Sequence, residues 1–319
     1  MKFLLRIFII SLILLSCKNE DKSNLDVSNI DVDYSIERFE SAFYNTTPES
    51  LINIKNKFPL LFPKAVSDSV WLAKINNKDE QELFQETQVL YSDFNEIKKQ
   101  FSSLFKHITY YNPRFKAPKV ITMISNIDYE NRVVYADSLL LVSLDVYLGK
   151  QHEFYADYPL YIKENNSKEH LIVDAANAII TTQIPTFNNR SFSSKIIAEG
   201  KKKYLLDIYL PFASEKEKTG YSIAKLNWAK QNEEEVWKFF IEKELLYSTD
   251  TKLNKRFIEN APFSKFYTAQ DNQSPGKMGV YIGWQIVRSF MKHNDVSLQK
   301  LITIDAQSLL DQSRYKPKK

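Results

Sequence analysis

Three short segments decide the fold class: KVITMI (residues 119–124), NRVVY (131–135) and SLLLVSL (138–144). They are rich in β-branched and other apolar residues, which favours strands. The polar stretch from Ser125 to Asp128 separates the first segment from the second. We therefore predict three strands that are close together in the chain and form a small sheet. Because helical patterns precede and follow them, the fold class is α+β rather than a regular alternation of strands and helices.

The chain on both sides of the sheet has helical periodicity. Near its start, Ile36, Phe39 and Phe43 recur at helical spacing and predict a first helix. The longest element is predicted over 79–111, where apolar residues form a continuous stripe. After Gly149 the pattern is helical to the end of the chain.

The composition predicts one large hydrophobic core. The chain is 44% hydrophobic and has only 6 glycines, so we expect a single, mostly helical α+β domain over 34–319. Removal of residues 1–16 would leave 41 basic and 39 acidic residues, a balance that excludes the basic surface of a nucleic-acid-binding protein. Cys17 is the only cysteine, so no disulfide within the chain is possible and stability must come from packing.

The first seventeen residues, MKFLLRIFIISLILLSC, are organised like a bacterial lipoprotein signal. Lys2 and Arg6 precede an apolar run that is shorter than the about 20 residues needed to span a bilayer. The run ends in Leu14-Leu15-Ser16-Cys17, which resembles a lipobox. We predict a signal peptide over 1–16; the alternative is an ordinary signal peptide with an incidental cysteine.

Lipidation would begin at Cys17, followed by a polar tether over 17–33. Several acyl chains on one N-terminus form a stable anchor, whereas a single chain is marginal. The sequence therefore predicts a lipoprotein of the cell envelope that is bound to a membrane through its N-terminal lipid. We expect it to face the periplasm rather than the outer surface.

Several kinds of catalytic or cofactor site are absent from the sequence. It contains no G-x-x-x-x-G-K-[ST] and no G-x-G-x-x-G, so a phosphate-binding glycine loop is not predicted. It contains no G-x-S-x-G, the turn that presents the nucleophile in α/β-hydrolases. We predict no cofactor.

A series of unusual phrases follows in the second half of the chain: EEEVW (233–237), ELLYSTD (244–250), RFI (256–258), APFSKFY (261–267), SPGKMGVYIGWQIVR (274–288) and SRYKP (313–317). With the lipobox and LDVYLG (144–149), this order resembles the gliding-motility lipoprotein GldB family of Bacteroidota over almost the whole mature chain. The resemblance implies a part in the gliding machinery and in the secretion system coupled to it. Its implied partners are other proteins of that machinery; the charge balance described above already excludes nucleic acid.

The layout also resembles, remotely, zinc peptidases of the gluzincin kind. In those enzymes a helix with H-E-x-x-H follows a sheet, and a later helix supplies a glutamate ligand. Glu199-Gly200 lies where that glutamate would fall, and His170 and Asp174 are four residues apart on a predicted helix. However, no H-E-x-x-H occurs, because Leu171 replaces the general-base glutamate. We interpret the layout as degenerate and zincin-like, with His170, Asp174 and Glu199 as metal ligands only if the fold brings them together.

Gly279 and Gly283 lie four residues apart in a strongly apolar helix over 280–290. Glycines at this spacing allow another backbone to approach closely, and we predict that this helix packs against the helix of Glu199. The many aromatic residues of this region are interpreted mainly as core. If a peptide or glycan cleft exists, its candidate residues are Glu199, Tyr204, Asp207, Trp284 and Arg288.

These expectations favour a non-enzymatic, membrane-anchored component or binding partner of the gliding and secretion machinery. The alternative is a metal-dependent peptidase, or a peptide-binding enzyme, with rearranged ligands. A third hypothesis is a cell-envelope chaperone for exported cargo. The zinc content of the purified protein distinguishes the metal-dependent alternative from the other two.

Overall fold

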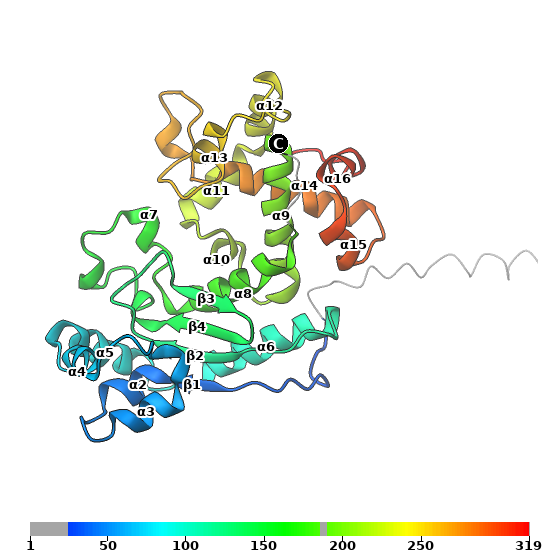
Figure 1. The fold of residues 1–319 in the computed structure, drawn as a ribbon. Coiled ribbons are helices and arrows are strands. Elements are labelled where there is room, and N and C mark those ends of the chain that lie inside the picture. The colour runs from blue at the N-terminus through cyan, green and yellow to red at the C-terminus, as the bar shows by residue number, and fades with distance from the viewer. Residues whose placement is uncertain (1–24, 186–189, 319) are drawn as a thin grey trace, which may run out of the picture.

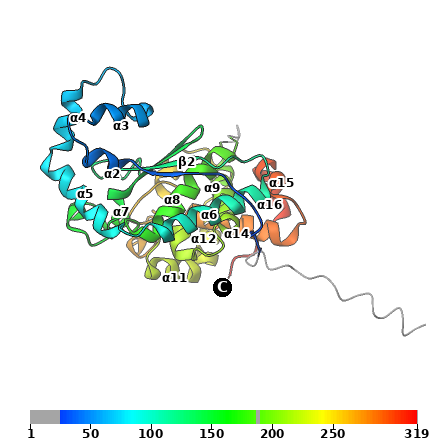
Figure 2. The same cartoon turned by 90° about the horizontal axis from the view of Figure 1, so that it is seen from below.

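The computed structural model describes residues 25–185 and 190–318. Its sheet lies between helices of the N-terminal part and a larger group of C-terminal helices (Figure 1, Figure 2). The predicted signal peptide and Cys17 lie outside the described residues, so lipidation stays a prediction. The end of the predicted tether, from Leu25 onwards, contacts the domain. The Ser28 carbonyl there accepts a hydrogen bond from the Lys106 ammonium group at 3.0 Å.

Four strands form one mixed sheet in the order β1-β2-β4-β3. They are β1 (Ile36–Arg38), β2 (Lys119–Met123), β3 (Val133–Ala136) and β4 (Leu139–Ser143). Strand β2 is parallel to β1 and to β4, whereas β3 and β4 are antiparallel. Val120 lies opposite Ile36 on one side and Leu140 on the other. The three predicted strands and the α+β class are confirmed.

The first strand was not predicted, and it replaces the start of an expected helix. Ile36 to Arg38 form β1, and the helix begins only at Phe39. Pairing starts just before it, where the Val120 amide donates to the Ser35 carbonyl at 2.9 Å. A three-residue edge strand has too short a pattern to be recognised, because its structure depends on a partner that is distant in sequence.

The helices fall into two sets. Before the sheet they are α2 (Phe39–Tyr44), α3 (Leu51–Lys57), α4 (Asp68–Ile75), α5 (Lys78–Leu90) and α6 (Asn95–Tyr111). After it they are α7 (Leu160–Lys163), α8 (Lys168–Gln183), α9 (Phe192–Tyr209), α10 (Glu215–Thr219), α11 (Ile223–Gln231), α12 (Glu233–Glu242), α13 (Lys252–Phe257), α14 (Met278–His293), α15 (Leu298–Thr303) and α16 (Ala306–Gln312). The helical second half is therefore confirmed. Among the described residues, none of these helices combines the length and apolarity that crossing a bilayer requires.

The single helix predicted over 79–111 is wrong, because α5 and α6 are separate helices. The Asp93 carboxylate accepts a hydrogen bond from the Asn95 amide at 2.8 Å and starts α6 anew. Such short polar side chains compete with the helix backbone for hydrogen bonds. The break places Tyr91 in the core, where its hydroxyl donates to the Tyr147 carbonyl at 3.1 Å.

The sheet separates two hydrophobic cores. Alternate strand residues point to opposite faces of a sheet. Val120 and Leu140 therefore belong to the larger core, which is built mainly on α6, α8, α9 and α14. Ile121 and Leu141 face the smaller core, which is built on α2 to α5. The C-terminal helices thus share one continuous core with only one face of the sheet.

Helices α9 and α14 pack with their backbones in direct contact. A Cβ atom at Gly283 would lie 1.8 Å from the Ile196 carbonyl oxygen, and one at Gly200 would lie 2.2 Å from the Gly283 oxygen. Neither position has room for a side chain. This confirms that the glycine-containing helix packs against the helix of Glu199.

We expect Gly283→Ala to lower the free energy of unfolding by about 1–3 kcal/mol or more, because even a methyl group must push α9 and α14 apart. Urea unfolding followed by circular dichroism measures the change. Lys292→Ala, on the exposed part of the same helix, serves as the control and should stay within about 0.5 kcal/mol of the original protein. Equal effects of the two substitutions would contradict the close packing.

Candidate functional site

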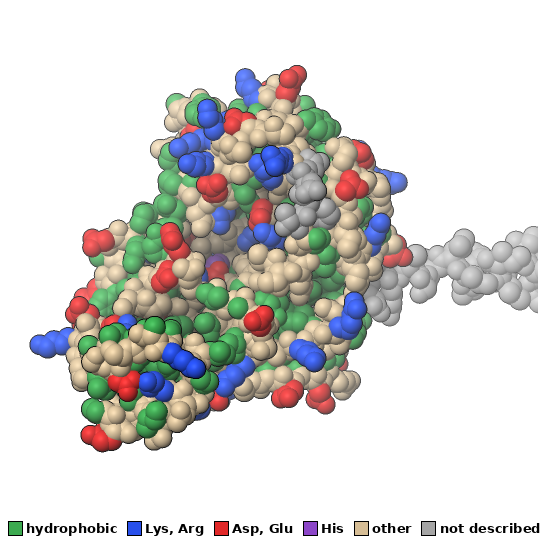
Figure 3. Space-filling view, in the orientation of Figure 1, with side chains coloured by type: hydrophobic (Ala, Val, Ile, Leu, Met, Phe, Trp, Pro, Cys, Tyr) green, Lys and Arg blue, Asp and Glu red, His purple; other side chains and the backbone are tan. Residues whose placement is uncertain are grey.

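A cleft opens where α7, the end of α10 and the start of α14 meet. It has two adjoining parts, with volumes of about 590 and 310 Å³. Both parts are lined by Tyr161, Asn165, Thr219, Gly220, Asn260 and Lys277. We call the whole space the cleft, the larger volume its apolar part and the smaller volume its polar part. Figure 3 shows a hollow near the middle of this face, with basic side chains inside it.

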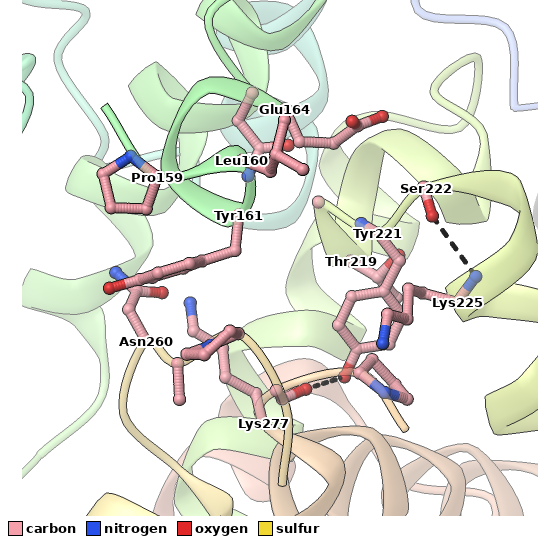
Figure 4. A pocket seen from close by; sticks show the side chains of 16 residues that line it. Pro159, Leu160, Tyr161, Glu164, Thr219, Tyr221, Ser222, Lys225, Asn260 and Lys277 are labelled. Carbon is pink, nitrogen blue, oxygen red and sulfur yellow. Dashed lines mark hydrogen bonds between the residues drawn. The ribbon is translucent and has the colours of Figure 1, made fainter. Parts of the chain in front are cut away.

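The apolar part is lined by loop residues on two sides. Pro159 and Leu160 lie at the start of α7, and Pro262 and Pro275 lie in the long loop before α14. Figure 4 shows Tyr161 on one side of this space and Tyr221 on the other. Prolines fix the backbone of these loops and offer rigid apolar surface. The part therefore suits an apolar group of a ligand.

The polar part has Asp174 of α8 on its wall, and this carboxylate is fully engaged. It accepts hydrogen bonds from Tyr147 at 2.9 Å and Arg132 at 3.4 Å, and it forms an ion pair with His170 at 3.3 Å. Burial disfavours the charged carboxylate, but His170, Arg132 and Tyr147 outweigh burial and lower the pKa of Asp174 well below its usual range. Asp174 is thus a charged, structurally paired group.

Lys203 of α9 also lines the polar part. Its ammonium group donates to the backbone carbonyl of Lys218. Burial, with a further contribution from the charge of Lys277, lowers the pKa of Lys203 to about 8. The nearby carboxylates of Glu199, Asp174 and Asp207 oppose this shift only in part. The lowered pKa of Lys203 is therefore mainly an effect of its burial.

Lys277 lies at the junction of the two parts, directly before α14 (Figure 4). Within the described residues its ammonium group has no hydrogen bond or ion pair. Burial lowers its pKa as well. Its backbone is left-handed, with φ of 58°, a conformation that is uncommon for a residue with a side chain. Lys277 is thus an unpaired cation held in a strained position.

Three of the five predicted cleft residues come together, although as a network beside the cleft. Asp207 accepts hydrogen bonds from Trp284 at 2.9 Å and from Arg288 at 2.7 Å. It also forms an ion pair with Lys218 at 3.2 Å, and Arg288 reaches Glu215 at 2.5 Å. These contacts join α9, α10 and α14. The network therefore supports the wall of the cleft.

The other two predicted cleft residues lie apart from this network's hydrogen bonds. Tyr204 is buried on α9 as part of the larger core, in keeping with the aromatic residues being mainly core. Glu199 forms an ion pair with Lys202 at 2.7 Å. Their role in ligand binding stays a prediction.

The three candidate metal ligands do not converge. His170 and Asp174 face each other, as their spacing allowed, but Glu199 is paired elsewhere. Across the described residues, no group of three His, Cys, Asp or Glu side chains could hold a metal ion. The lysines of the polar part carry positive charge, which repels a metal cation.

Sequence reasoning missed the cations that give the cleft its character, namely Lys203, Lys218, Lys277 and Arg132. One signal was present: Pro275-Gly276 before Lys277 marks a turn immediately before a helix. Lysines are common on surfaces, however, and nothing in their spacing reveals that two of them point into one buried space.

Comparison with known proteins gives one family. The family model described as gliding motility protein GldB matches residues 20–317, almost the entire chain. The curated proteins and the solved structures contain no match.

We expect Asp174→Asn to lower the free energy of unfolding at pH 7 by about 1–3 kcal/mol, because Arg132 and Tyr147 lose a charged acceptor. A lowered pKa stabilises the folded state above the unfolded-state pKa of about 3.9, and this stabilisation is lost as the pH falls towards the folded-state pKa. The difference between the two proteins should therefore shrink below about pH 4. Urea unfolding at several pH values measures it.

Asp157→Asn replaces an exposed aspartate that has no hydrogen bond or ion pair with any described residue, and it is the matched control. It should change the free energy of unfolding little at any of these pH values. A difference for Asp174→Asn that stays constant from pH 7 to pH 3 would contradict the assigned pKa.

Proposed function

Because this chain belongs to the family of gliding motility protein GldB, we propose that it works in gliding motility as a lipid-anchored binding protein and not as an enzyme. Its cleft would hold a segment of another protein of the gliding machinery. The lipid at Cys17 would keep that complex on a membrane of the cell envelope, on the periplasmic side. Anchoring, side and binding role are parts of this proposal.

The proposal rests on which polar groups of the cleft already have a hydrogen-bond or ion-pair partner. Asp174, the acid on the polar wall, is already paired with three donors. Among the described residues, the cleft groups without a hydrogen bond or ion pair include the ammonium of Lys277, the side-chain amides of Asn165 and Asn260, and the exposed carboxylate of Glu130. Ammonium and amide groups can hold a ligand by hydrogen bonds. The two amides do not titrate in water, so they act as hydrogen-bonding groups and not as general bases.

The alternative function, a peptidase with rearranged metal ligands, needs carboxylate or imidazole groups that are free to converge on a cation. In the described part of the chain, His170 and Asp174 form an ion pair with each other, and Glu199 forms an ion pair with Lys202. No specific observation favours this alternative. The arrangement supports binding without catalysis.

The anchor can be tested by Cys17→Ser, which removes the only thiol in the chain. We expect the variant to lose metabolic labelling by a fatty-acid analogue and to move from the membrane to the soluble envelope fraction, since its acyl chains are gone. Ser16→Ala, which keeps the thiol, is the control and should still be labelled. A serine variant that remains labelled and membrane-bound would contradict the lipoprotein prediction.

The non-enzymatic role can be tested by Glu199→Gln, which keeps the shape of the candidate ligand and removes its charge. In a deletion strain, we expect this variant to restore most colony spreading at normal protein level. A metal ligand or catalytic acid would instead lose about 10²-fold in metal affinity or activity. Glu235→Gln, at an exposed position on α12, controls for the loss of a surface carboxylate.

Protein level is measured by immunoblot beside spreading. Normal amounts of Glu199→Gln protein without spreading would overturn the non-enzymatic proposal and restore an active site at Glu199.

A further inference from the structure

The backbone at the start of α14 is unusual in a way that points to Lys277. Gly276, the residue before it, has no room for a side chain, because a Cβ atom there would lie 2.2 Å from the Ala261 carbonyl oxygen. Lys277 then adopts φ of 58°, where glycine is the favoured residue. Six other described non-glycine residues also have a positive φ; Lys277 differs from them in joining this strained conformation to an unpaired ammonium group at the junction of the two parts of the cleft. A lysine at this position is therefore not explained by the needs of the turn.

The charge around Lys277 is unbalanced. The carboxylates nearest to it in electrostatic effect are Glu199 and Asp174. Glu199 is paired with Lys202, and Asp174 is paired with Arg132 and His170. Of the other two lysines that line this space, Lys218 is paired with Asp207, whereas Lys203 donates to a backbone carbonyl. Two ammonium groups thus share the polar part without a carboxylate of their own.

Such an arrangement is costly without a ligand, because like charges repel and burial removes their hydration. An anion placed between Lys277 and Lys203 would offset both effects. Its hydrogen bonds to the two ammonium groups would be charge-assisted, and such bonds are stronger than neutral ones. The polar part therefore fits one negatively charged group.

The surroundings favour a peptide as the source of this anion. The side-chain amides of Asn165 and Asn260 line both parts of the cleft and can each donate to and accept from a peptide group. Directly beside the cations, the apolar part offers Pro159, Leu160 and Tyr221 as a wall for a neighbouring side chain. A free phosphate would use the cations only and would leave this wall unoccupied.

We propose that the cleft binds a peptide segment through a carboxylate that lies between Lys277 and Lys203, while an adjacent apolar side chain occupies the apolar part. The inference rests on the proposed function and names the chemistry of its ligand. The carboxylate belongs either to an aspartate or glutamate of the segment or to the carboxyl terminus of a chain. The experiment separates these two sources.

The test uses the full-length protein, purified in detergent and immobilised, with three pools of synthetic pentapeptides of random flanking sequence. The first pool has a central glutamate and blocked ends, the second a central glutamine and a free carboxyl terminus, and the third a central glutamine and blocked ends. Bound peptides are quantified by mass spectrometry. We expect the first or the second pool to be retained at least about tenfold better than the third, which corresponds to about 1.4 kcal/mol. The retained pool identifies the source of the carboxylate.

Lys277→Gly removes the ammonium group and relieves the left-handed strain, so its melting temperature should not fall below that of the original protein. It should nevertheless lose the preference for acidic peptides. Lys216→Met removes an exposed cation from α10, outside the cleft, and should keep it. Lys203→Met provides a second cleft variant and should also lose the preference for acidic peptides. It keeps the test decisive if Lys277→Gly does not fold.

Three results would overturn the inference. They are equal retention of all pools, an unchanged preference in Lys277→Gly, and displacement of the acidic peptides by inorganic phosphate at the same concentration as the peptides. Each would reject the carboxylate ligand. The proposed function is judged separately, by spreading and labelling with Glu199→Gln and Cys17→Ser, so that its failure is recognised independently.

Discussion

The contact between α9 and α14 is the constraint on which the rest of the C-terminal structure depends. Gly200 and Gly283 remove the side chains that would otherwise separate the two helices, so that the backbone of α9 contacts the backbone of α14. Close contact fixes the relative position of two helices more tightly than interdigitating side chains, which can repack. Because α9 carries Lys203 and α14 starts directly after Lys277, the same contact sets where the two cations of the cleft lie.

A network of charged side chains lies beside the contact between α9 and α14. Asp207 binds Trp284, Arg288 and Lys218, and Glu215 completes the network through Arg288. Each charge in this network has a partner of opposite sign, so it ties α10 to the paired helices. It also positions the end of α10, where the Lys218 carbonyl accepts the hydrogen bond from Lys203. The charges of this network are thus paired with one another, whereas Lys277 in the adjoining cleft has no partner among the described residues.

The elements that could be predicted from the sequence are those determined by a local pattern of residues. The elements that could not be predicted depend on contacts between residues that are distant in the sequence. Strands β2 and β4 were recognisable because they are apolar, β-branched and buried, whereas β1 exists only through its pairing with β2. The pair of His170 and Asp174 followed from helical spacing. The lack of a partner for Lys277 did not, because it depends on a turn geometry and on the pairing of the nearest acids, Asp174 and Glu199, with other residues.

The place of β1 has a mechanical consequence. It is an edge strand that begins a few residues after the predicted tether, and it runs parallel to β2. A pull on a lipid anchor would act along the strand, so that the hydrogen bonds to β2 would be stretched together and not opened one after another. Glu37 adds ion pairs to Lys57 at 2.7 Å and to Lys119 at 3.8 Å across this junction. Under the proposed anchoring at Cys17, β1 would be the first element to carry tension, and it would carry it in shear.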